Sequence, residues 1–380
     1  MKLFKSLLIA PAALGLIAPI TVSATEVNLN EISNYSNEEI EIDSSSFSNQ
    51  KANSLLAGGE GMVDSHDHDG GFSETTTASF SADMAIGSVD GVAGAEAVQG
   101  LYGFQIDLNT SFTGEDSLDI SIDAGNGGNG LTQFALNEVG AGDDVLAVDG
   151  IAYTFPLGDK TTVFVGDSMD GSTLYSTACV YGGPSDNLDD CGNGSSALGA
   201  GAGTAAGASF DLGNGFTAAL GYTGNGSAAA GLLTKEGLDA YGGQLSYAAD
   251  SYGLSVTYAN IESADDTTFW ALNGYWTPDS AGSVPSISVG YEMGDPETAN
   301  DSTQWFAGFQ WDEVGPGSLG AAVGTIGSVT DGNEEYLMYE AFYSYPVNDG
   351  MTITPLVYIQ ETVSTSDDIT GVMVKTSFSF

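Results

Sequence analysis

Apolar and polar residues alternate along much of this chain. In the last nine residues, every second position belongs to one mainly apolar set: Val372, Val374, Thr376, Phe378 and Phe380. A period of two residues is that of a β-strand, because successive side chains of a strand point to opposite faces. The same alternation recurs over 102–109, 118–123 and 252–259. The pattern predicts a chain built from strands, each with one apolar and one polar face.

Strand-like segments separated by turn residues follow one another from Phe72 to the C-terminus. The predicted strands are 72–86, 100–113, 117–124, 145–156, 161–167, 203–212, 215–223, 239–249, 252–261, 267–277, 284–293, 302–312, 316–327, 334–345, 350–360 and 369–380. These make about sixteen strands, an even number, as is usual for single-chain bacterial membrane barrels.

The lengths of the connections support a barrel. Short joins at 158–160, 213–215, 250–251 and 347–350 fall at every second connection or a multiple of it, and the longer pieces 125–144, 168–202 and 224–238 lie between the earlier ones. Membrane barrels alternate short turns with longer loops, whereas a soluble β-sandwich has no reason to do so. Aromatic residues near strand ends suit the two membrane interfaces: Tyr252, Tyr258, Trp276, Trp305 and Trp311. The predicted fold class is all-β, a transmembrane antiparallel β-barrel occupying 72–380.

The N-terminal part differs from the rest. Lys2 and Lys5 precede an apolar run from Leu7 to Ile20 and a small-residue cleavage site ending at Ala24, so 1–24 is predicted to be a secretory signal peptide. Residues 25–71 are acidic and poor in aromatic residues, and we expect a flexible periplasmic leader there.

Both histidines of the chain, His66 and His68, lie in this leader next to aspartates. Imidazole and carboxylate groups can bind a divalent metal, although exposed linkers also collect such residues. A Ser–His dyad within the barrel is excluded unless the leader folds into it. The sequence therefore predicts no enzyme and no resident cofactor, with loosely bound calcium or another divalent cation as the open alternative.

The charge of the chain is strongly negative. It contains 51 acidic residues, six lysines and no arginine, for a formal net charge of -45. Repulsion excludes nucleic acid as a partner. The acidity has two open explanations, a saline habitat or selectivity of a pore.

The C-terminal 45 or so residues carry a family resemblance. Residues 339–358, together with the terminal sequence VKTSFSF, resemble the last strands of cyanobacterial outer-membrane porins, and 109–114 and 10–16 are similar to earlier parts of them. The resemblance implies an integral protein of the outer membrane, with Phe378 and Phe380 as the signal read by the barrel-assembly machinery. It also implies contact with lipid and lipopolysaccharide, a homotrimer, and carbohydrates among the solutes. Many such porins carry an S-layer-homology domain, which residues 25–71 do not resemble.

The longest connection of the barrel region, 168–202, is the predicted constriction loop. Cys179 and Cys191 are expected to form a disulfide in it, because the chain is exported to an oxidising compartment. The alternative is a surface loop that the disulfide protects from proteolysis. The predicted constriction residues are Asp167, Asp170, Tyr175, Tyr181, Asp186, Asp189 and Asp190.

The polar faces of the strands predict the lumen. The candidate lumen residues are Asp107, Asp119, Asp123, Glu292, Glu340 and Lys375. Carboxylates around a water-filled pore favour cations over anions. We therefore expect a porin for passive diffusion of small hydrophilic solutes and ions, with cation preference. The alternative is a non-conducting, calcium-binding structural or surface protein of the cell envelope.

Overall fold

The computed structural model describes residues 75–92, 96–126, 144–185, 188, 191–192, 203–226, 229–234, 237–263, 265–279, 282–362 and 367–380. The chain divides into two units, Met1–His68 and Asp69–Phe380, and every described residue belongs to the second. The predicted signal peptide and the whole of the predicted leader, including His66 and His68, lie outside the described residues.

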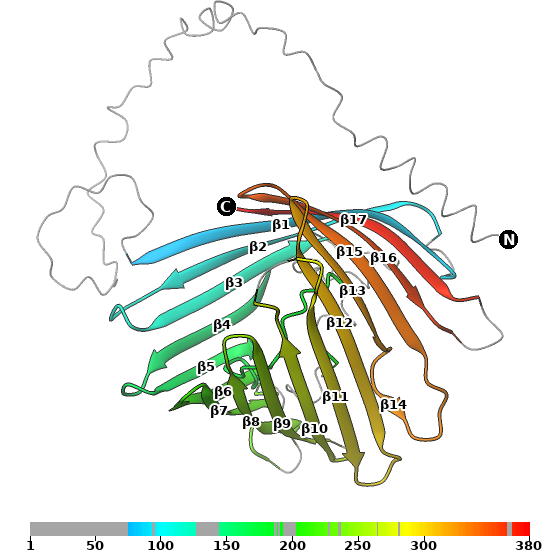
Figure 1. Ribbon diagram of the computed structural model, residues 1–380. Helices are drawn as coiled ribbons and strands as arrows, with labels where there is room; N and C mark the ends of the chain where they lie inside the picture. The colour runs from blue at the N-terminus through cyan, green and yellow to red at the C-terminus, as the bar shows by residue number, and fades with distance from the viewer. Residues whose placement is uncertain are drawn as a thin grey trace, which may run out of the picture. The chain divides into compact units, whose positions relative to one another are not determined.

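The described residues form one antiparallel sheet that closes on itself (Figure 1). Each long strand pairs with its neighbours along the chain, and β1 pairs with the last strand to complete the barrel. The strands are β1 (Thr76–Asp90), β2 (Gln99–Thr110), β3 (Ser117–Gly125), β4 (Ala147–Pro156), β5 (Thr161–Met169), β6 (Gly203–Gly213), β7 (Phe216–Gly224), β8 (Asp239–Ala248), β9 (Tyr252–Glu262), β10 (Thr267–Trp276), β11 (Ser286–Pro296), β12 (Ser302–Val314), β13 (Gly317–Thr325), β14 (Val329–Thr330), β15 (Leu337–Asn348), β16 (Met351–Gln360) and β17 (Ile369–Ser379).

The predicted fold class is confirmed. The short strand β14 lies in the connection between β13 and β15, where it pairs with β12, and the other strands form a closed barrel of sixteen. Each predicted range overlaps one of these sixteen strands. The largest shift is in β1, which continues to Asp90 because Gly87 and Ser88 stay in register with β17. Gly87 has no side chain, so the alternation on which the prediction relied is weak there.

The register divides the barrel into an inner and an outer face. Outward positions carry large apolar side chains that are exposed, among them Met84, Ile86, Leu220, Leu254, Leu272, Val289 and Val372. A soluble protein rarely exposes so continuous an apolar surface, whereas a membrane barrel presents it to lipid. Among the described residues no helix is long and apolar enough to span a membrane, a finding that has no bearing on strands.

Aromatic side chains lie near both ends of the outer face. At the end with the short turns, Phe216, Tyr247 and Tyr252 form a row, with ring centroids 4.7 Å and 5.8 Å apart. Nearer the other end, Tyr258 packs against Trp270 with the ring centroids 5.1 Å apart. Aromatic side chains favour the level of the lipid headgroups. The apolar band between them is therefore the membrane-facing part of the barrel.

Candidate functional site

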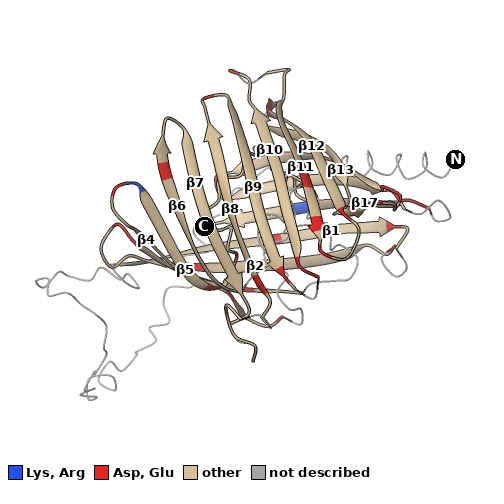
Figure 2. Ribbon diagram, turned by 90° about the horizontal axis from the view of Figure 1, so that it is seen from below, with Lys and Arg blue, Asp and Glu red and all other residues tan. Residues whose placement is uncertain are grey.

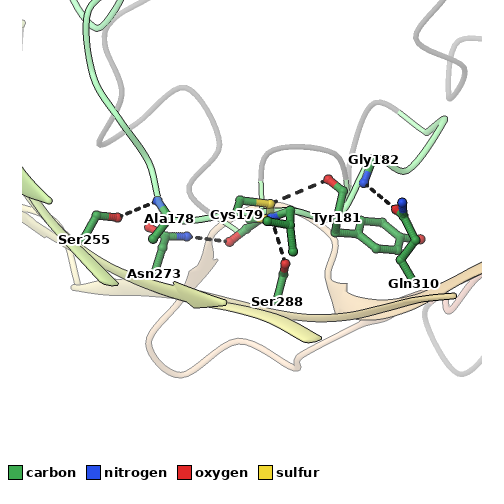
Figure 3. The surroundings of a disulfide bond; sticks show 10 residues. Ala178, Cys179, Tyr181, Gly182, Ser255, Asn273, Ser288 and Gln310 are labelled. Carbon is green, nitrogen blue, oxygen red and sulfur yellow. Dashed lines mark hydrogen bonds between the residues drawn. A yellow bond between two sulfur atoms is a disulfide. The ribbon is translucent and has the colours of Figure 1, made fainter. Parts of the chain in front are cut away.

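The connection between β5 and β6 runs along the inside of the barrel. From 176 to 182 it is extended, and every second backbone N–H donates a hydrogen bond to an inward side chain of a different strand. Figure 3 shows the bonds to Ser255, Ser288 and Gln310. This regular spacing seats the segment across β8, β9, β11 and β12. The four bonds are Ser176 to Gln244 Oε1 (2.6 Å), Ala178 to Ser255 Oγ (3.0 Å), Val180 to Ser288 Oγ (3.0 Å) and Gly182 to Gln310 Oε1 (3.1 Å).

The later part of the same connection is attached to the same side of the barrel. Asn273 Nδ2 donates to the carbonyl of Cys191 (3.0 Å), and Gln304 Nε2 donates to the carbonyl of Gly192 (2.6 Å). A Cβ at position 290 would overlap the Cys191 carbonyl oxygen, so only glycine lets the loop come this close to β11. Wall side chains thus satisfy loop carbonyls as well as loop N–H groups.

The expected disulfide is present. Cys179 and Cys191 are bonded, with their Cα atoms 6.2 Å apart and 12 positions apart in the sequence. The bond joins the outgoing and returning parts of the loop, both of which contact the wall of β8 to β12. The disulfide therefore closes a ring, and its described residues include Tyr181 and Leu188.

An apolar cluster lies beneath the loop. The ring of Tyr181 packs between Phe306 and Phe342, with centroid distances of 5.3 Å and 5.9 Å. Leu188 and Cys191 join it from the loop, and the barrel supplies Ala85, Val89, Ala322, Met338, Leu356, Tyr358 and Met373. Apolar residues on the inner face of a water-filled barrel would otherwise face water, so their burial against the loop stabilises the seated loop.

We call the inner face of the barrel that lies under the loop the covered wall, and two of the candidate lumen carboxylates lie on it, one on β11 and one on β15. Glu292 is 1 % exposed and Glu340 is 4 % exposed. Glu340 Oε1 accepts a hydrogen bond from the Tyr181 hydroxyl at 2.6 Å. Burial, followed by the charge of Glu340, raises the pKa of Tyr181, which stays protonated as the donor. Both carboxylates face inward, but the solvent in the barrel does not reach them freely.

The opposite inner wall, formed by β2, β3 and β4, carries the other candidate carboxylates. Asp107 accepts hydrogen bonds from Gln105 and Ser121, each at 2.6 Å. Asp119 accepts from Asn109 and Ser117, also at 2.6 Å. These bonds fix the direction of the carboxylates without neutralising their charge. We call the inward residues Asp107, Asp119, Asp123 and Asp149 the acidic wall.

Asp149 is a member of this wall that the sequence reasoning missed. Strict alternation from Ile151 would place it on the outer face, but the pairing of β3 with β4 shifts by one residue at this point. Asp149 is the extra residue of that bulge, and it lies close enough to Asp123 and Asp107 to feel their charges. Bulges leave little trace in an alternating pattern, so only the register reveals it.

Lys375 is the only basic residue at an inward position in the part of the chain that the structure describes; the other basic residue described, Lys160, lies in the turn before β5. Lys375 Nζ lies 3.6 Å from Asp83 Oδ2, and the aspartate is buried. Figure 2 shows how few basic residues there are beside the acidic ones. The lysine charge is therefore balanced locally and does not offset the acidic wall.

The remaining candidate residues are spread over several places. Asp167 is exposed at the end of β5, on the outward register, and accepts a hydrogen bond from Thr204 (2.6 Å). Asp170 is exposed at the start of the loop. Burial raises the pKa of Tyr175 to about 12, and a Cβ at Gly242 would lie 2.9 Å from its hydroxyl oxygen. Asp186, Asp189 and Asp190 lie outside the described residues.

Phe378 and Phe380 lie on the outward register of β17. Phe380 exchanges two backbone hydrogen bonds with Phe80 of β1, at 2.8 Å and 2.9 Å, and the two rings stack at 5.8 Å. The last residue of the chain therefore takes part in closing the barrel. Within the described ranges, no group of three or more His, Cys, Asp or Glu side chains is arranged to hold a metal ion.

No family model matches this sequence, and no curated protein matches it. Solved structures do match its fold. OprB of Pseudomonas putida has a TM-score of 0.61 at 13 % identity, over 80 % of this chain and 94 % of that one. The anion-selective porin of Comamonas acidovorans has 0.55 at 12 %, over 80 % and 99 %, and a mutant porin of Rh. blastica has 0.51 at 13 %, over 80 % and 100 %. At such identities the likeness concerns the fold, and this chain therefore has the fold of an integral β-barrel of the bacterial outer membrane, that of the porins.

Proposed function

We propose that this protein is an outer-membrane porin that lets small hydrophilic solutes and ions diffuse passively, with a preference for cations. The acidic wall is the observation that carries the proposal. Its carboxylates face the inside of the barrel, and the one described lysine at an inward position is paired with Asp83. Carboxylates that line a water-filled path lower the energy of a cation and raise that of an anion.

The seated loop supports a narrowed path in this proposal. Its described part covers the wall of β8 to β12, which leaves the acidic wall facing the space that remains. Because the loop is bound at many points and closed by the disulfide, we infer a fixed constriction. A fixed constriction keeps solutes near the carboxylates, where their field is least screened.

The barrel fold alone does not determine whether a pore prefers cations or anions. One of the structures that match is described as an anion-selective porin, although its barrel is similar to this one. The sign of the preference must therefore come from the residues that line the path. Here those residues are acidic.

The family resemblance adds further elements to the proposal. Residues 339–358 support a cyanobacterial-type porin, carbohydrates among the solutes, a homotrimer, and contact with lipopolysaccharide and the barrel-assembly machinery. Each of these elements is open to test independently of conduction.

The test is the reversal potential of the purified protein in a planar bilayer under a salt gradient. We expect stepwise conductance and a cation-selective potential. A variant with Asp107→Asn, Asp119→Asn and Asp123→Asn should lower the cation-to-anion permeability ratio by about fivefold, since a charge at contact distance in water is worth about 1 kcal/mol. Raising the salt to about 1 M, where the screening length is roughly 3 Å, should reduce the selectivity of the unmodified protein.

The matched control removes three carboxylates from short turns outside the strands. Asp159→Asn, Asp250→Asn and Asp349→Asn change the net charge equally, and all three residues are exposed. This control should keep most of the selectivity. Anion preference in the unmodified protein would contradict the role of the acidic wall, and a folded barrel that does not conduct would contradict the porin.

A further inference from the structure

Near its start, the seated loop crosses the inner wall through two glycines. Gly171 is buried in the loop, and Gly221 is the residue of β7 that follows Leu220, whose side chain is exposed on the outer face. Position 221 therefore points inward. A Cβ at position 221 would overlap the Gly171 carbonyl oxygen, and a Cβ at position 171 would lie 2.9 Å from Thr223 Oγ1 and from the Tyr222 carbonyl carbon. Loop backbone and wall backbone touch here because neither residue has a side chain.

The returning part of the loop makes the same kind of contact on β11. Gly290 points inward, since its neighbours Val289 and Tyr291 are exposed on the outer face. A Cβ at position 290 would overlap the Cys191 carbonyl oxygen. Cys191 and Gly192 both have positive φ angles, 54° and 75°, a conformation that residues other than glycine seldom adopt. The outgoing and the returning part of the loop each meet one glycine of the wall.

The hydrogen bonds and the glycines act on the loop in different ways. The hydrogen bonds determine how firmly the loop is held, whereas the glycines determine how close to the wall its backbone can lie. The acidic wall faces the space that the loop leaves open. Each shift of the loop away from its own wall therefore narrows that space. The side chains that accept hydrogen bonds from the loop N–H groups are Gln244, Ser255, Ser288 and Gln310.

We propose that Gly221 and Gly290 determine the width of the pore, and with it the largest solute that passes. This inference rests on the proposed porin function and adds the residues that select solutes by size. A methyl group at either position points at the loop backbone, which has to move by roughly 1 Å or more to restore ordinary contact distances. The long side chains of Gln244 and Gln310 can follow the loop, so it stays attached but stands further into the lumen.

The direction of the effect separates the width of the pore from the attachment of the loop. Removing wall side chains that accept hydrogen bonds from the loop frees the loop and should raise the conductance. Adding a methyl group beneath the attached loop should lower the conductance. A loss of stability alone predicts neither change.

The test is the entry of glucose and sucrose into liposomes that contain the purified full-length processed protein. Both sugars are neutral, so the acidic wall does not discriminate between them by charge. We expect Gly221→Ala and Gly290→Ala each to lower the ratio of sucrose entry to glucose entry by about twofold, because passage through a narrow pore depends on its diameter. The single-channel conductance of both variants should also fall, without added noise.

The matched control is Gly253→Ala on β9. Gly253 also points inward, but a Cβ there would collide with the ring of Tyr275 on the paired strand β10 and not with the loop. This variant should unfold at a lower urea concentration and keep the sugar ratio of the unmodified protein. Gly100→Ala on β2, where no atom of the described chain lies within 4 Å of the added Cβ, should change neither property.

Three results would overturn the proposal, provided that heat-dependent mobility in detergent gels shows each variant to be folded. Unchanged sugar ratios in Gly221→Ala and Gly290→Ala would mean that the two glycines do not set the width. A higher and noisier conductance would mean that the methyl group detaches the loop. An equal fall of the ratio in Gly253→Ala would assign the effect to strain in the wall. A folded, unmodified barrel that passes neither sugar nor ions would instead contradict the porin function itself.

Discussion

The covered wall and the acidic wall differ in what their inward polar side chains bind. On the covered wall, inward amides and hydroxyls of β8 to β12 hydrogen-bond the loop backbone. On the acidic wall, the inward groups of β2 to β4 are carboxylates, held by their own neighbours. Neutral side chains can satisfy a buried backbone without bringing charge into a dry place. The side chains that hydrogen-bond the loop backbone are accordingly neutral, although each wall also holds a buried carboxylate, Glu292 on the covered wall and Asp123 on the acidic wall.

The largest effect should follow from releasing the loop. Ser255→Ala, Ser288→Ala and Gln310→Ala together leave three loop N–H groups without acceptors, and each such loss costs about 1–3 kcal/mol when the group stays buried. We expect the loop to leave the wall, with a higher and noisier single-channel conductance in planar bilayers.

The control for the released loop makes the same kind of change on the acidic wall. Gln105→Ala, Ser117→Ala and Ser121→Ala remove side chains that hydrogen-bond Asp107 and Asp119. Conductance should then stay near that of the unmodified protein. Equal noise in both variants would mean that the two walls do not differ in the way proposed.

A smaller effect is expected from removing the disulfide. Cys179→Ser with Cys191→Ser opens a loop whose ends are 12 positions apart. Closing a loop of this size lowers the entropy of the unfolded chain, which is worth about 3 kcal/mol. Because the seated loop keeps its hydrogen bonds, we expect a lower unfolding midpoint in urea and an unchanged mean conductance. A large conductance change would show that the disulfide, rather than the wall, seats the loop.

Removing a single buried hydroxyl should have a smaller effect than removing the disulfide. Tyr181→Phe removes the donor to Glu340 and leaves that buried carboxylate with one partner fewer, at a cost of about 1–3 kcal/mol. The unfolding midpoint should fall by a corresponding amount. Tyr358→Phe is the matched control, because Tyr358 is buried on the same wall and makes no hydrogen bond through its hydroxyl within the described ranges. Equal shifts in the two variants would argue against the Tyr181–Glu340 bond.

Much of the barrel could be predicted from the sequence, because its determinants are local. Alternation assigns Asp107, Asp119 and Lys375 to the polar face, and the structure places all three inward. The bulge at Asp149 breaks this rule, because an extra residue changes the face without changing the residue types. The path of the loop depends on partners far along the chain, such as Ser288 for Val180. The sequence shows Gln and Ser residues at inward positions of several strands, but it does not show that the fold aligns them in one row along the loop.

Asp116 is a carboxylate near the acidic wall, but it acts by hydrogen-bonding its own turn and the neighbouring Tyr153. It lies in the turn between β2 and β3, where Oδ1 accepts hydrogen bonds from the N–H groups of Phe112 (3.0 Å) and Thr113 (2.8 Å) and from two hydroxyls, and Oδ2 accepts from Tyr153 (2.6 Å). These donors, led by Tyr153, hold the pKa of Asp116 well below its usual range.

A lowered folded-state pKa means that Asp116 stabilises the barrel above the unfolded-state value of about 3.9 and loses this contribution as the pH falls toward the folded-state value. Asp116→Asn should therefore lower the unfolding midpoint at pH 7, and its deficit should shrink as the pH falls below about 4. Its reversal potential should equal that of the unmodified protein, since Asp116 lies in the turn between β2 and β3 and not on the inward face of a strand. A changed reversal potential in Asp116→Asn would mean that the acidic wall extends into this turn.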